Sequence, residues 1–444
     1  MMFNEKHSKS IFGGVALATA GALLLSACSS SSEAPKTDGS GSAAASGETI
    51  ELTFNTWLPT QDQWPEIVAA FEEENSDIKI NFNRDEDYAA FIGNLDNEIL
   101  AGTTPDLFGV QVGASLDDYA DFTLDTSEYA TDWIGGLNAA AVEQTTTTDG
   151  TVAAVPILMG GMEYYAYNKT LMDELGMELP TDYDSLLAVS KAARDAGYSP
   201  FAMGAADTWH DVDFFVWMSN QFGEGGDIYK AAAGDIPWDS ESIVAAAARW
   251  QDLFADGVFE DAATTVTTYP GARDDYFFAR KAPFFPTGSW HVGAAFAISP
   301  EIPGTAVEND EIGFALMPTL GDTDAGVTSG VDFALAISSD SSPEKQAAAA
   351  KFVKFMAVGT GQQLWSNTFQ GFPVANDVTV ELGADETQLA KDSLALTVES
   401  LQASKYARKL VAPGNDSLEN DLGIILQKIA DGADPASELA ALKS

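Results

Sequence analysis

The chain carries alternating apolar positions at residues 50–54, a period-2 pattern that is typical of a β-strand. A second alternating run follows at residues 78–82. Between them, residues 64–71 place apolar side chains at helical spacing behind Pro65, which the first turn of a helix tolerates. A strand, a helix and a strand in this order predict an α/β layer with a mainly parallel sheet.

The next segment repeats the alternation of helix and strand. Residues 88–100 carry apolar side chains on one helical face, and Gly102 is a typical residue to end that helix. The apolar run that follows ends near Gln111 and predicts a further strand. About 400 residues of this kind predict two or three domains on length alone.

Short motifs continue along the chain in a fixed order. They are Ala101-Gly102-Thr103-Thr104-Pro105-Asp106, Val155-Pro156-Ile157, Tyr167-Asn168-Lys169, Leu179-Pro180-Thr181-Asp182-Tyr183-Asp184, Gly288-Ser289-Trp290, Ser329-Gly330-Val331-Asp332 and Gly371-Phe372-Pro373-Val374. Over residues 50–442 this order resembles the sugar-binding, maltose-binding-protein-like family of bacterial extracellular solute-binding proteins. Tyr183 stands where that family usually has tryptophan, and Ala279-Arg280-Lys281-Ala282 stands where it more often has Gly-Lys-Ala.

The resemblance implies an α/β, two-lobed periplasmic-binding-protein-like fold with a hinge that the chain crosses three times. We expect lobe 1 to contain residues 48–156 and 318–358, and lobe 2 to contain residues 157–317 and 359–444. The three crossings are then expected near residues 154–157, 316–320 and 358–361.

The N-terminal residues predict export and lipid attachment. Residues 11–25 form an apolar run behind Lys6 and Lys9, and the run is short for a membrane span but typical of a signal peptide. Leu25-Ser26-Ala27-Cys28 resembles a bacterial lipobox, and Cys28 is the sole cysteine of the chain. We therefore predict a signal peptide at 1–27, a lipid on Cys28 and a flexible tether at 28–47. The alternative is an ordinary buried cysteine near the start of a membrane span.

The charge balance excludes several partners. The chain has 67 Asp and Glu against 22 Lys and Arg, a net charge of −45. Such a field repels nucleic acid and anionic lipid headgroups, so neither is expected as a direct partner. The phosphate-binding Gly-x-x-x-x-Gly-Lys loop and the hydrolase Gly-x-Ser-x-Gly turn are missing, and His210 and His291 are too few for a typical zinc site. We expect no cofactor, no metal and no enzymatic activity.

Large aromatic residues beside acidic and amide groups are the chemistry that the sequence does offer. The C–H face of a sugar ring packs on an aromatic ring, and its hydroxyls need directed carboxylate or amide partners. The candidate ligand-binding residues are Trp57, Gln111, Glu163, Trp209, His210, Asp211, Trp290, Asp332 and Phe333. Five of them have a plainer alternative: packing for Trp57, an ordinary strand-end position for Gln111, the surface for Glu163, local capping or hydrogen bonding for His210 and a helix N-cap for Asp211. Trp64, Trp217 and Trp250 lie at helical spacing among apolar residues and are expected in the core.

These observations predict an extracellular carbohydrate-binding lipoprotein that captures a sugar or oligosaccharide between two lobes. We expect a monomer that is held at the extracellular face of the cytoplasmic membrane by its N-terminal lipid. Its partner would be the membrane subunits of an ABC transporter. A receptor for a peptide or an organic cation and a surface glycoside hydrolase remain as alternatives.

Overall fold

The computed structural model describes residues 49–442, apart from 87, 148–149, 262, 298, 300, 413–414 and 416. The predicted signal peptide, Cys28 and the tether lie outside these described residues. Among the helices that the structure describes, none has both the length and the apolar character that a membrane span requires.

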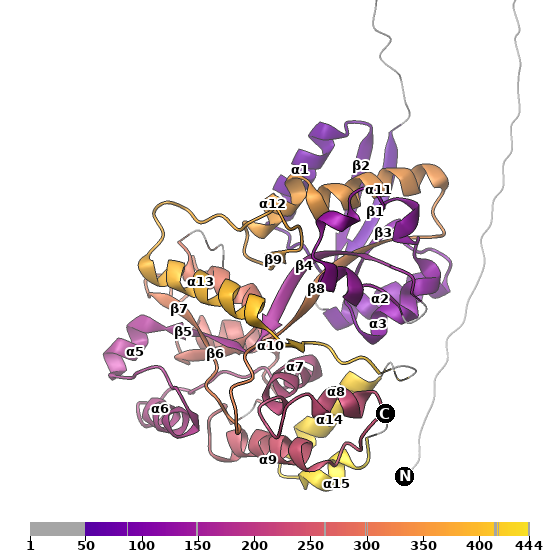
Figure 1. Ribbon diagram of the computed structural model, residues 1–444. Helices are drawn as coiled ribbons and strands as arrows, with labels where there is room; N and C mark the ends of the chain where they lie inside the picture. The colour runs from indigo at the N-terminus through magenta and orange to yellow at the C-terminus, as the bar shows by residue number, and fades with distance from the viewer. Residues whose placement is uncertain are drawn as a thin grey trace, which may run out of the picture. The chain divides into compact units, whose positions relative to one another are not determined.

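The first sheet has the strand order β2-β1-β3-β8-β4-β9, and β10 pairs with β8 beside this path (Figure 1). Its strands are β1 (Ile50–Thr56), β2 (Ile78–Arg84), β3 (Leu107–Val110), β4 (Val155–Met162), β8 (Thr328–Ile337), β9 (Phe372–Pro373) and β10 (Tyr406–Ala407). β2, β1 and β3 are parallel, whereas β8 runs antiparallel to both β3 and β4. The predicted parallel layer is therefore found along β2-β1-β3, and β8 reverses direction between β3 and β4, both of which run opposite to it.

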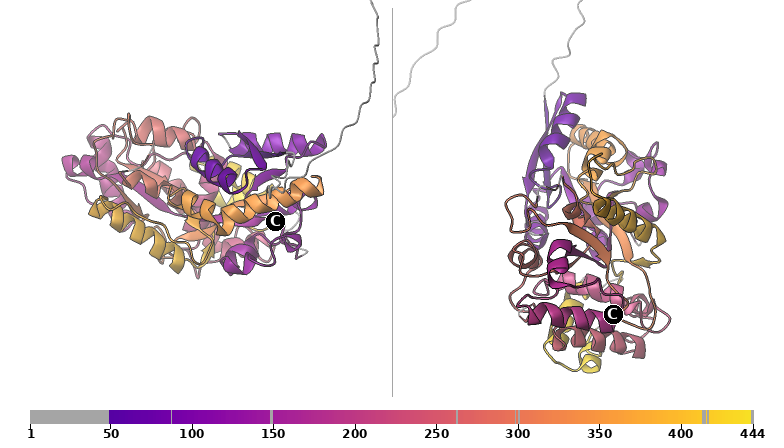
Figure 2. Two further views of the ribbon diagram at one scale, coloured as in Figure 1. Left: turned by 90° about the horizontal axis from the view of Figure 1, so that it is seen from above. Right: turned by 90° about the vertical axis from the view of Figure 1, so that its left-hand side faces the viewer.

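Apolar helix faces cover the first sheet. The helices beside it include α1 (Trp64–Glu74), α2 (Tyr88–Leu100), α11 (Pro343–Val358) and α12 (Thr360–Ser366), and α11 lies along β1 and β4 (Figures 1 and 2). Shorter segments are α3 (Ala114–Tyr119) and α4 (Ala139–Gln144). The ring of Phe352 on α11 contacts Phe54 on β1 and Phe71 on α1, with centroid distances of 5.7 and 5.0 Å. The period-3.6 pattern thus predicts α2 with its observed bounds, because one face of that helix packs on the sheet.

The second sheet is antiparallel, with the order β6-β5-β7. Its strands are β5 (Tyr164–Asn168), β6 (Phe284–Thr287) and β7 (Ile312–Leu316), and α13 (Gln388–Ala403) packs on β7. Nearby segments are α5 (Lys169–Leu175), α6 (Tyr183–Asp195), α10 (Tyr269–Gly271), the π-helical η4 (Ala272–Phe277) and the 3-10 helix η5 (Ser289–Ala295). Every strand of this sheet is apolar on both faces, which is why it needs cover on both sides.

A helical layer packs on the other side of the second sheet. It contains α7 (Thr208–Ser219), α8 (Asp227–Ala232), α9 (Glu241–Ala255), α14 (Leu418–Ala430) and α15 (Pro435–Leu439) (Figure 1). Trp250 on α9 is fully buried, and its indole N–H donates to the backbone oxygen of Leu426 at 2.9 Å. Trp64 and Trp217 are also buried, so the predicted core positions of these three tryptophans are confirmed.

The chain passes between the two sheets several times. Connections run from β4 to β5 at Met162-Glu163-Tyr164, from β7 to β8 through residues 317–327, and from β9 to α13, which packs on the second sheet, through residues 374–387. After α13 the chain returns to the first sheet at β10, which pairs with β8, before it enters α14. α12 and β9 pack with the first sheet, because Trp365 and Val374 share its apolar cluster with Phe333 and Phe352. The packing therefore differs from the predicted lobe bounds at two places: β4 stays in the first sheet beyond residue 156, and α12 with Val374 and Ala375 lies with the first sheet, whereas Phe369 and Phe372 pack in the apolar cluster of the second sheet.

Candidate functional site

A tight turn after β6 positions Trp290. The motif Gly288-Ser289-Trp290 leads from β6 into η5, and a Cβ atom at Gly288 would lie 2.1 Å from the indole ring. Only glycine therefore lets the indole fold back over its own turn. The hydroxyl of Ser289 accepts a hydrogen bond of 3.0 Å from the backbone N–H of Gly161 on β4. The turn thus holds a half-buried tryptophan next to a strand of the first sheet.

Two further aromatic rings surround Trp290. Its indole N–H donates to the Tyr269 hydroxyl at 2.6 Å. The Trp209 ring lies 4.8 Å from Tyr269 and 6.3 Å from Trp290, centroid to centroid. Trp209 and Trp290 keep partly exposed faces, whereas Tyr269 is buried. The structure therefore brings together two predicted site residues that are distant in sequence, and we name Trp209, Tyr269 and Trp290 the aromatic cluster.

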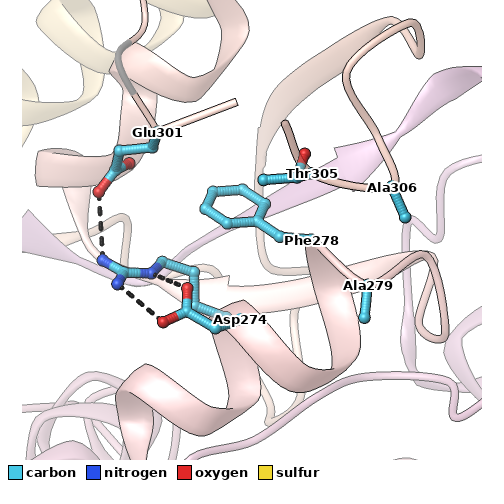
Figure 3. Close-up of a pocket in the computed structure, with 7 residues that line it drawn as sticks. Asp274, Phe278, Ala279, Glu301, Thr305 and Ala306 are labelled. Carbon is cyan, nitrogen blue, oxygen red and sulfur yellow. Dashed lines mark hydrogen bonds and ion pairs between the residues drawn. The ribbon is translucent and has the colours of Figure 1, made fainter. Parts of the chain in front are cut away.

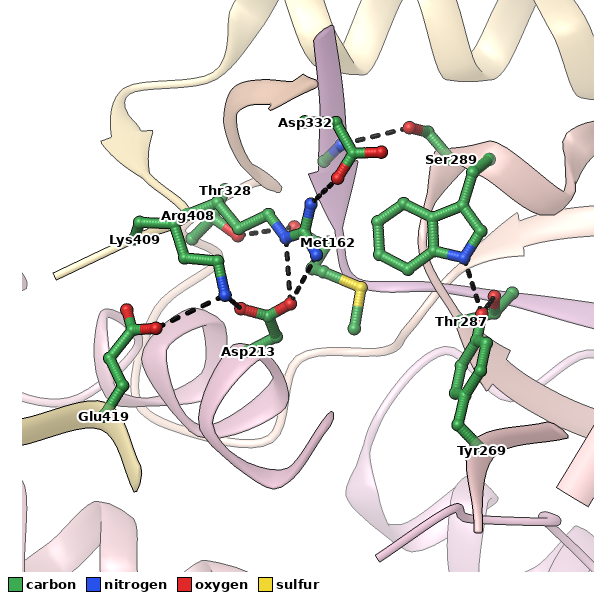
Figure 4. Close-up of polar contacts among 12 residues, drawn as sticks. Met162, Asp213, Tyr269, Thr287, Ser289, Thr328, Asp332, Arg408, Lys409 and Glu419 are labelled. Carbon is green, nitrogen blue, oxygen red and sulfur yellow. Dashed lines mark hydrogen bonds and ion pairs between the residues drawn. The ribbon is translucent and has the colours of Figure 1, made fainter. Parts of the chain in front are cut away.

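Arg408 joins the aromatic cluster to two carboxylates. Its guanidinium carbon lies 4.4 Å from the centre of the Trp290 ring, which is a cation–π contact. The same guanidinium donates to Asp332 on β8, and twice to Oδ2 of Asp213 on α7, at 2.9 and 2.7 Å (Figure 4). Arg408 therefore connects the first sheet, the helical layer and the turn after β6.

A second cation extends this network. The ammonium group of Lys409 donates to Oδ1 of Asp213 at 3.1 Å and to Glu419 on α14 at 3.3 Å. Burial would raise the pKa of Asp213, but Arg408 and Lys409 outweigh it and hold that pKa below its usual value. Asp213 is therefore an ionised carboxylate in a buried place, with both oxygens bound to cations. We name Asp213, Asp332, Arg408, Lys409 and Glu419 the ion-pair network.

Glu163 lies in the connection from β4 to β5 and is fully buried. Neither of its carboxyl oxygens accepts a hydrogen bond of good geometry within the described part of the chain, and the N–H of Thr287 is the backbone donor that faces it. Burial, and then the charge of Asp213, raise the pKa of Glu163 well above its usual value, although Thr287 and Arg408 act in the opposite direction. Glu163 therefore carries a proton in conditions where an exposed glutamate is ionised.

His210 and Asp211 occupy the first turns of α7. Residues 209–211 are helical, because α7 begins at Thr208, and the suggested N-cap role of Asp211 is wrong since Asp207 is the N-cap residue. Burial lowers the pKa of His210 to about 3, so this ring is neutral at physiological pH. Asp211 is also fully buried, and burial, followed by the charge of Asp207, raises its pKa well above the usual value.

The remaining candidates lie on the side of the first sheet. Trp57 is half-buried and packs on Tyr88, Phe91 and Phe333, with centroid distances of 4.9, 5.2 and 5.0 Å. Phe333 has no exposed surface and also contacts Trp365. Gln111 follows β3 and is half-buried. In this conformation Phe333 packs against Trp57, and its own ring has no exposed surface that a ligand could contact.

The comparison with known families decides the class of protein. Residues 66–393 match the family model that is described as bacterial extracellular solute-binding protein. The chain belongs to this family. The prediction of an extracellular solute-binding protein is therefore confirmed, and the family places the chain outside the cytoplasm.

Relatives of this solute-binding protein are distant in sequence. A "Multiple sugar-binding protein" of Streptococcus mutans is 24% identical over 339 residues, which cover 74% of this chain and 75% of that one. A "Probable sugar-binding periplasmic protein" of Mesorhizobium japonicum is 28% identical over 97 residues, which cover 22% of this chain. The chain matches 23% of the length of that protein, and the same share of its counterpart in Rhizobium meliloti.

Solved structures share the fold of this solute-binding protein. A "Chitin oligosaccharide binding protein" has a TM-score of 0.71 at 19% identity, and the match covers 88% of this chain and 97% of that one. A maltose-bound protein of T. maritima also has a TM-score of 0.71, at 21% identity, with 88% and 98% covered. The predicted α/β fold of the two-lobed binding proteins is therefore confirmed.

Three residues at the centre of the site are missing from the predicted set. Tyr269 follows Thr268 and precedes Pro270, a pattern that indicates a helix start but not a site. Arg408 and Asp213 carry no sequence signal either, because their roles depend on each other across the fold. The sequence feature that could have pointed to Arg408 and Asp213 is the pair of adjacent basic residues Arg408-Lys409 in so acidic a chain.

Proposed function

We propose that this solute-binding protein is a sugar receptor that binds its ligand where β8, α7 and the turn after β6 meet. The observation that carries the proposal is the aromatic cluster beside acidic groups: Trp209 and Trp290 are partly exposed, and Arg408 joins the Trp290 ring to Asp332. Glu163 is buried near the same Arg408. Aromatic faces suit the C–H side of a pyranose, and carboxyl groups suit its hydroxyls. The names of the sugar-binding relatives in Streptococcus mutans and Mesorhizobium japonicum support a sugar as the ligand.

Capture would proceed by closure of the two sheet-centred halves, which we take as the two lobes. Trp290 follows a strand of the second sheet, whereas Asp332 belongs to the first, so a sugar that contacts both favours the arrangement in which they are close. The bound receptor, acting as a monomer, would then deliver the sugar to the membrane subunits of an ABC importer.

The ion pairs favour capture without hydrolysis. A retaining glycosidase needs one carboxyl group that donates a proton and a second, free carboxylate that attacks the sugar. Glu163 has the raised pKa of a proton donor, but both oxygens of Asp213 bind cations, and Asp332 is paired with Arg408. We therefore propose that a bound sugar is released unchanged.

A thermal-shift screen of residues 48–444 tests the ligand class. The panel contains D-galactose, maltose, raffinose and N-acetylated chito-oligosaccharides, with choline and a mixed tripeptide as representatives of the other solute classes. A ligand that binds the native state alone raises the melting temperature. We expect a shift with at least one sugar and none with choline or the tripeptide; the reverse pattern refutes the sugar assignment. Recovery of intact sugar after incubation with the protein tests the absence of turnover.

We also propose a lipid anchor on Cys28, which rests on the Leu-Ser-Ala-Cys motif. Expression in a bacterial host with labelled palmitate should give a labelled, membrane-bound protein. Cys28→Ser should lose the label, and equal label in both proteins would refute the anchor.

A further inference from the structure

A cavity of about 370 Å³ lies in residues that the proposed site does not use. It is lined by Arg273, Asp274, Phe278, Ala279, Glu301, Thr305 and Ala306, and we name it the Arg273 cavity (Figure 3). η4 and the residues after it supply one wall, and the loop that follows η5 supplies the other. Small-molecule sites span roughly 300–1,000 Å³, so this volume suits a single small ring rather than a long chain.

The charges in the Arg273 cavity select against anions. Arg273 donates to both oxygens of Asp274, at 2.7 and 3.1 Å, and to Glu301 at 3.1 Å (Figure 3). Two carboxylates against one guanidinium leave a net negative charge at this place. A phosphate or a uronic acid would meet repulsion in the cavity, whereas a neutral polar molecule would not.

The same residues match the requirements of a sugar ring. Phe278 contributes an aromatic side chain to the wall, and Thr305 contributes a hydroxyl. Each carboxylate oxygen has two lone pairs, so the pairing of Asp274 and Glu301 with Arg273 leaves acceptor capacity for hydroxyl groups. Aromatic surface combined with charged hydrogen-bonding groups is the same chemistry that the aromatic cluster offers.

A short chain of contacts connects the Arg273 cavity to the aromatic cluster. Nε2 of His291 lies 4.0 Å from Glu301, and its Nδ1 lies 2.8 Å from the hydroxyl of Tyr269, which also accepts the N–H of Trp290. Glu301, which lines the cavity, is therefore connected to Trp290 of the aromatic cluster through His291 and Tyr269.

We propose that the Arg273 cavity is a second subsite, which holds a further neutral sugar ring of an oligosaccharide whose first ring lies on Trp290. This inference rests on the proposed function and adds the length of the ligand: the receptor prefers an oligosaccharide to a monosaccharide.

Calorimetric titration with monosaccharides and trisaccharides tests the second subsite. The probes are glucose and maltotriose, xylose and xylotriose, and N-acetylglucosamine and triacetylchitotriose. The variants are Asp274→Asn and Glu301→Gln, which each weaken one charged acceptor, and Ala306→Phe, which fills the cavity and keeps every charge. Asp377→Asn is the matched control, because Asp377 lines a different cavity, of about 420 Å³. Melting curves confirm that each variant folds.

In the series that binds the wild type, we expect the trisaccharide to bind at least tenfold more tightly than the monosaccharide. The three cavity variants should weaken the trisaccharide about tenfold, the usual size for one lost charged hydrogen bond, and leave the monosaccharide within twofold. The control should change neither. Unchanged trisaccharide affinity in all three variants, or an equal loss for both probes, overturns the second subsite while the proposed function stands. If no sugar binds the wild type, the proposed function itself fails, and the inference fails with it.

Discussion

The ion-pair network and the group formed by Glu163 and His210 are both buried near Arg408, and they solve the problem of burial in opposite ways. Asp213 remains ionised because Arg408 and Lys409 bind its two oxygens. Glu163 and His210 lack such partners among the described residues, and their shifted pKa values keep both of them neutral. The first group depends on its cations for stability, whereas the second depends on its protonation state.

The largest effect should follow the loss of the central cation. Arg408→Met takes from Asp332 the cation that binds it and leaves Asp213 with Lys409 alone, and removal of one partner from a buried pair costs about 3–5 kcal/mol. We expect the free energy of unfolding, measured with urea, to fall by about this amount. Lys191→Met removes an exposed ion pair with Asp195 and should change nothing measurable. Adding Asp213→Asn to the Arg408→Met protein should restore part of the lost stability. If Arg408→Met leaves the stability unchanged and Asp213→Asn restores nothing, the ion-pair network does not support the fold.

The unpaired group should respond to pH instead. The unfolded chain releases the proton of Glu163 near its ordinary pKa of 4.5, but the folded protein keeps it until a higher pH. The folded state therefore binds more protons above pH 4.5, so Glu163 lowers the stability as the pH rises, until its raised pKa is passed. Glu163→Gln should match the wild type at pH 4.5 and gain up to about 1.4 kcal/mol of relative stability per pH unit above it.

Unfolding by urea from pH 4.5 to neutral pH checks the response of Glu163. Glu241→Gln, a change of an exposed residue at the start of α9, is the control and should follow the wild-type profile. A stability difference between Glu163→Gln and wild type that stays constant with pH would contradict a neutral, buried Glu163.

The aromatic cluster, which contacts the network through Arg408, should govern affinity. Trp290→Ala removes a ring face and should weaken the best sugar by about 2 kcal/mol, which is roughly 30-fold. Trp250→Phe, a core change that also loses the hydrogen bond to Leu426, should lower the melting temperature and leave affinity unchanged. Calorimetry that finds wild-type affinity in a folded Trp290→Ala protein would place the sugar elsewhere.

The smallest effect should come from the second cation. Lys409→Met removes one hydrogen bond to Asp213 and one to Glu419, but both contacts of Arg408 with Asp213 remain. We expect a loss of about 1.5 kcal/mol in urea unfolding. A loss as large as that of Arg408→Met would mean that the two cations are equally necessary.

Periodic segments of the fold are predictable from the sequence, and connections between distant elements are not. Residues 88–100 form the expected helix because a whole face of it packs on the first sheet. The start of α7 cannot be predicted from the sequence. Its first turn contains Trp209, His210 and Asp211, and these polar and aromatic residues form no apolar stripe, although the helix is buried. Propensity and pattern give little guidance where tertiary packing covers a helix on all sides.

The site residues also divide into those that the sequence predicts and those that only the fold reveals. The motif Gly288-Ser289-Trp290 can be recognised in the sequence by its resemblance to the family, and the structure gives its physical reason: Gly288 must be glycine for the indole to pack on its turn. Arg408 is not visible, since β10 has two residues and no repeating pattern. Asp332 is predicted to accept hydroxyl groups from a sugar, which stays a prediction, but its contact with Arg408 could be found only in the fold.

The position of Arg408 and Lys409 in the chain has a consequence for synthesis. Asp213 and Asp332 are synthesised well before Arg408 and Lys409, the cations of the ion-pair network. Both cations lie shortly before the C-terminal helices α14 and α15 in the sequence. A nascent chain that ends before residue 408 would have to bury two carboxylates without counter-ions, so it gains little by closing this region early. The junction between the two sheets can therefore become stable only when the final part of the chain has emerged, which would keep the polypeptide loosely folded while it is being exported.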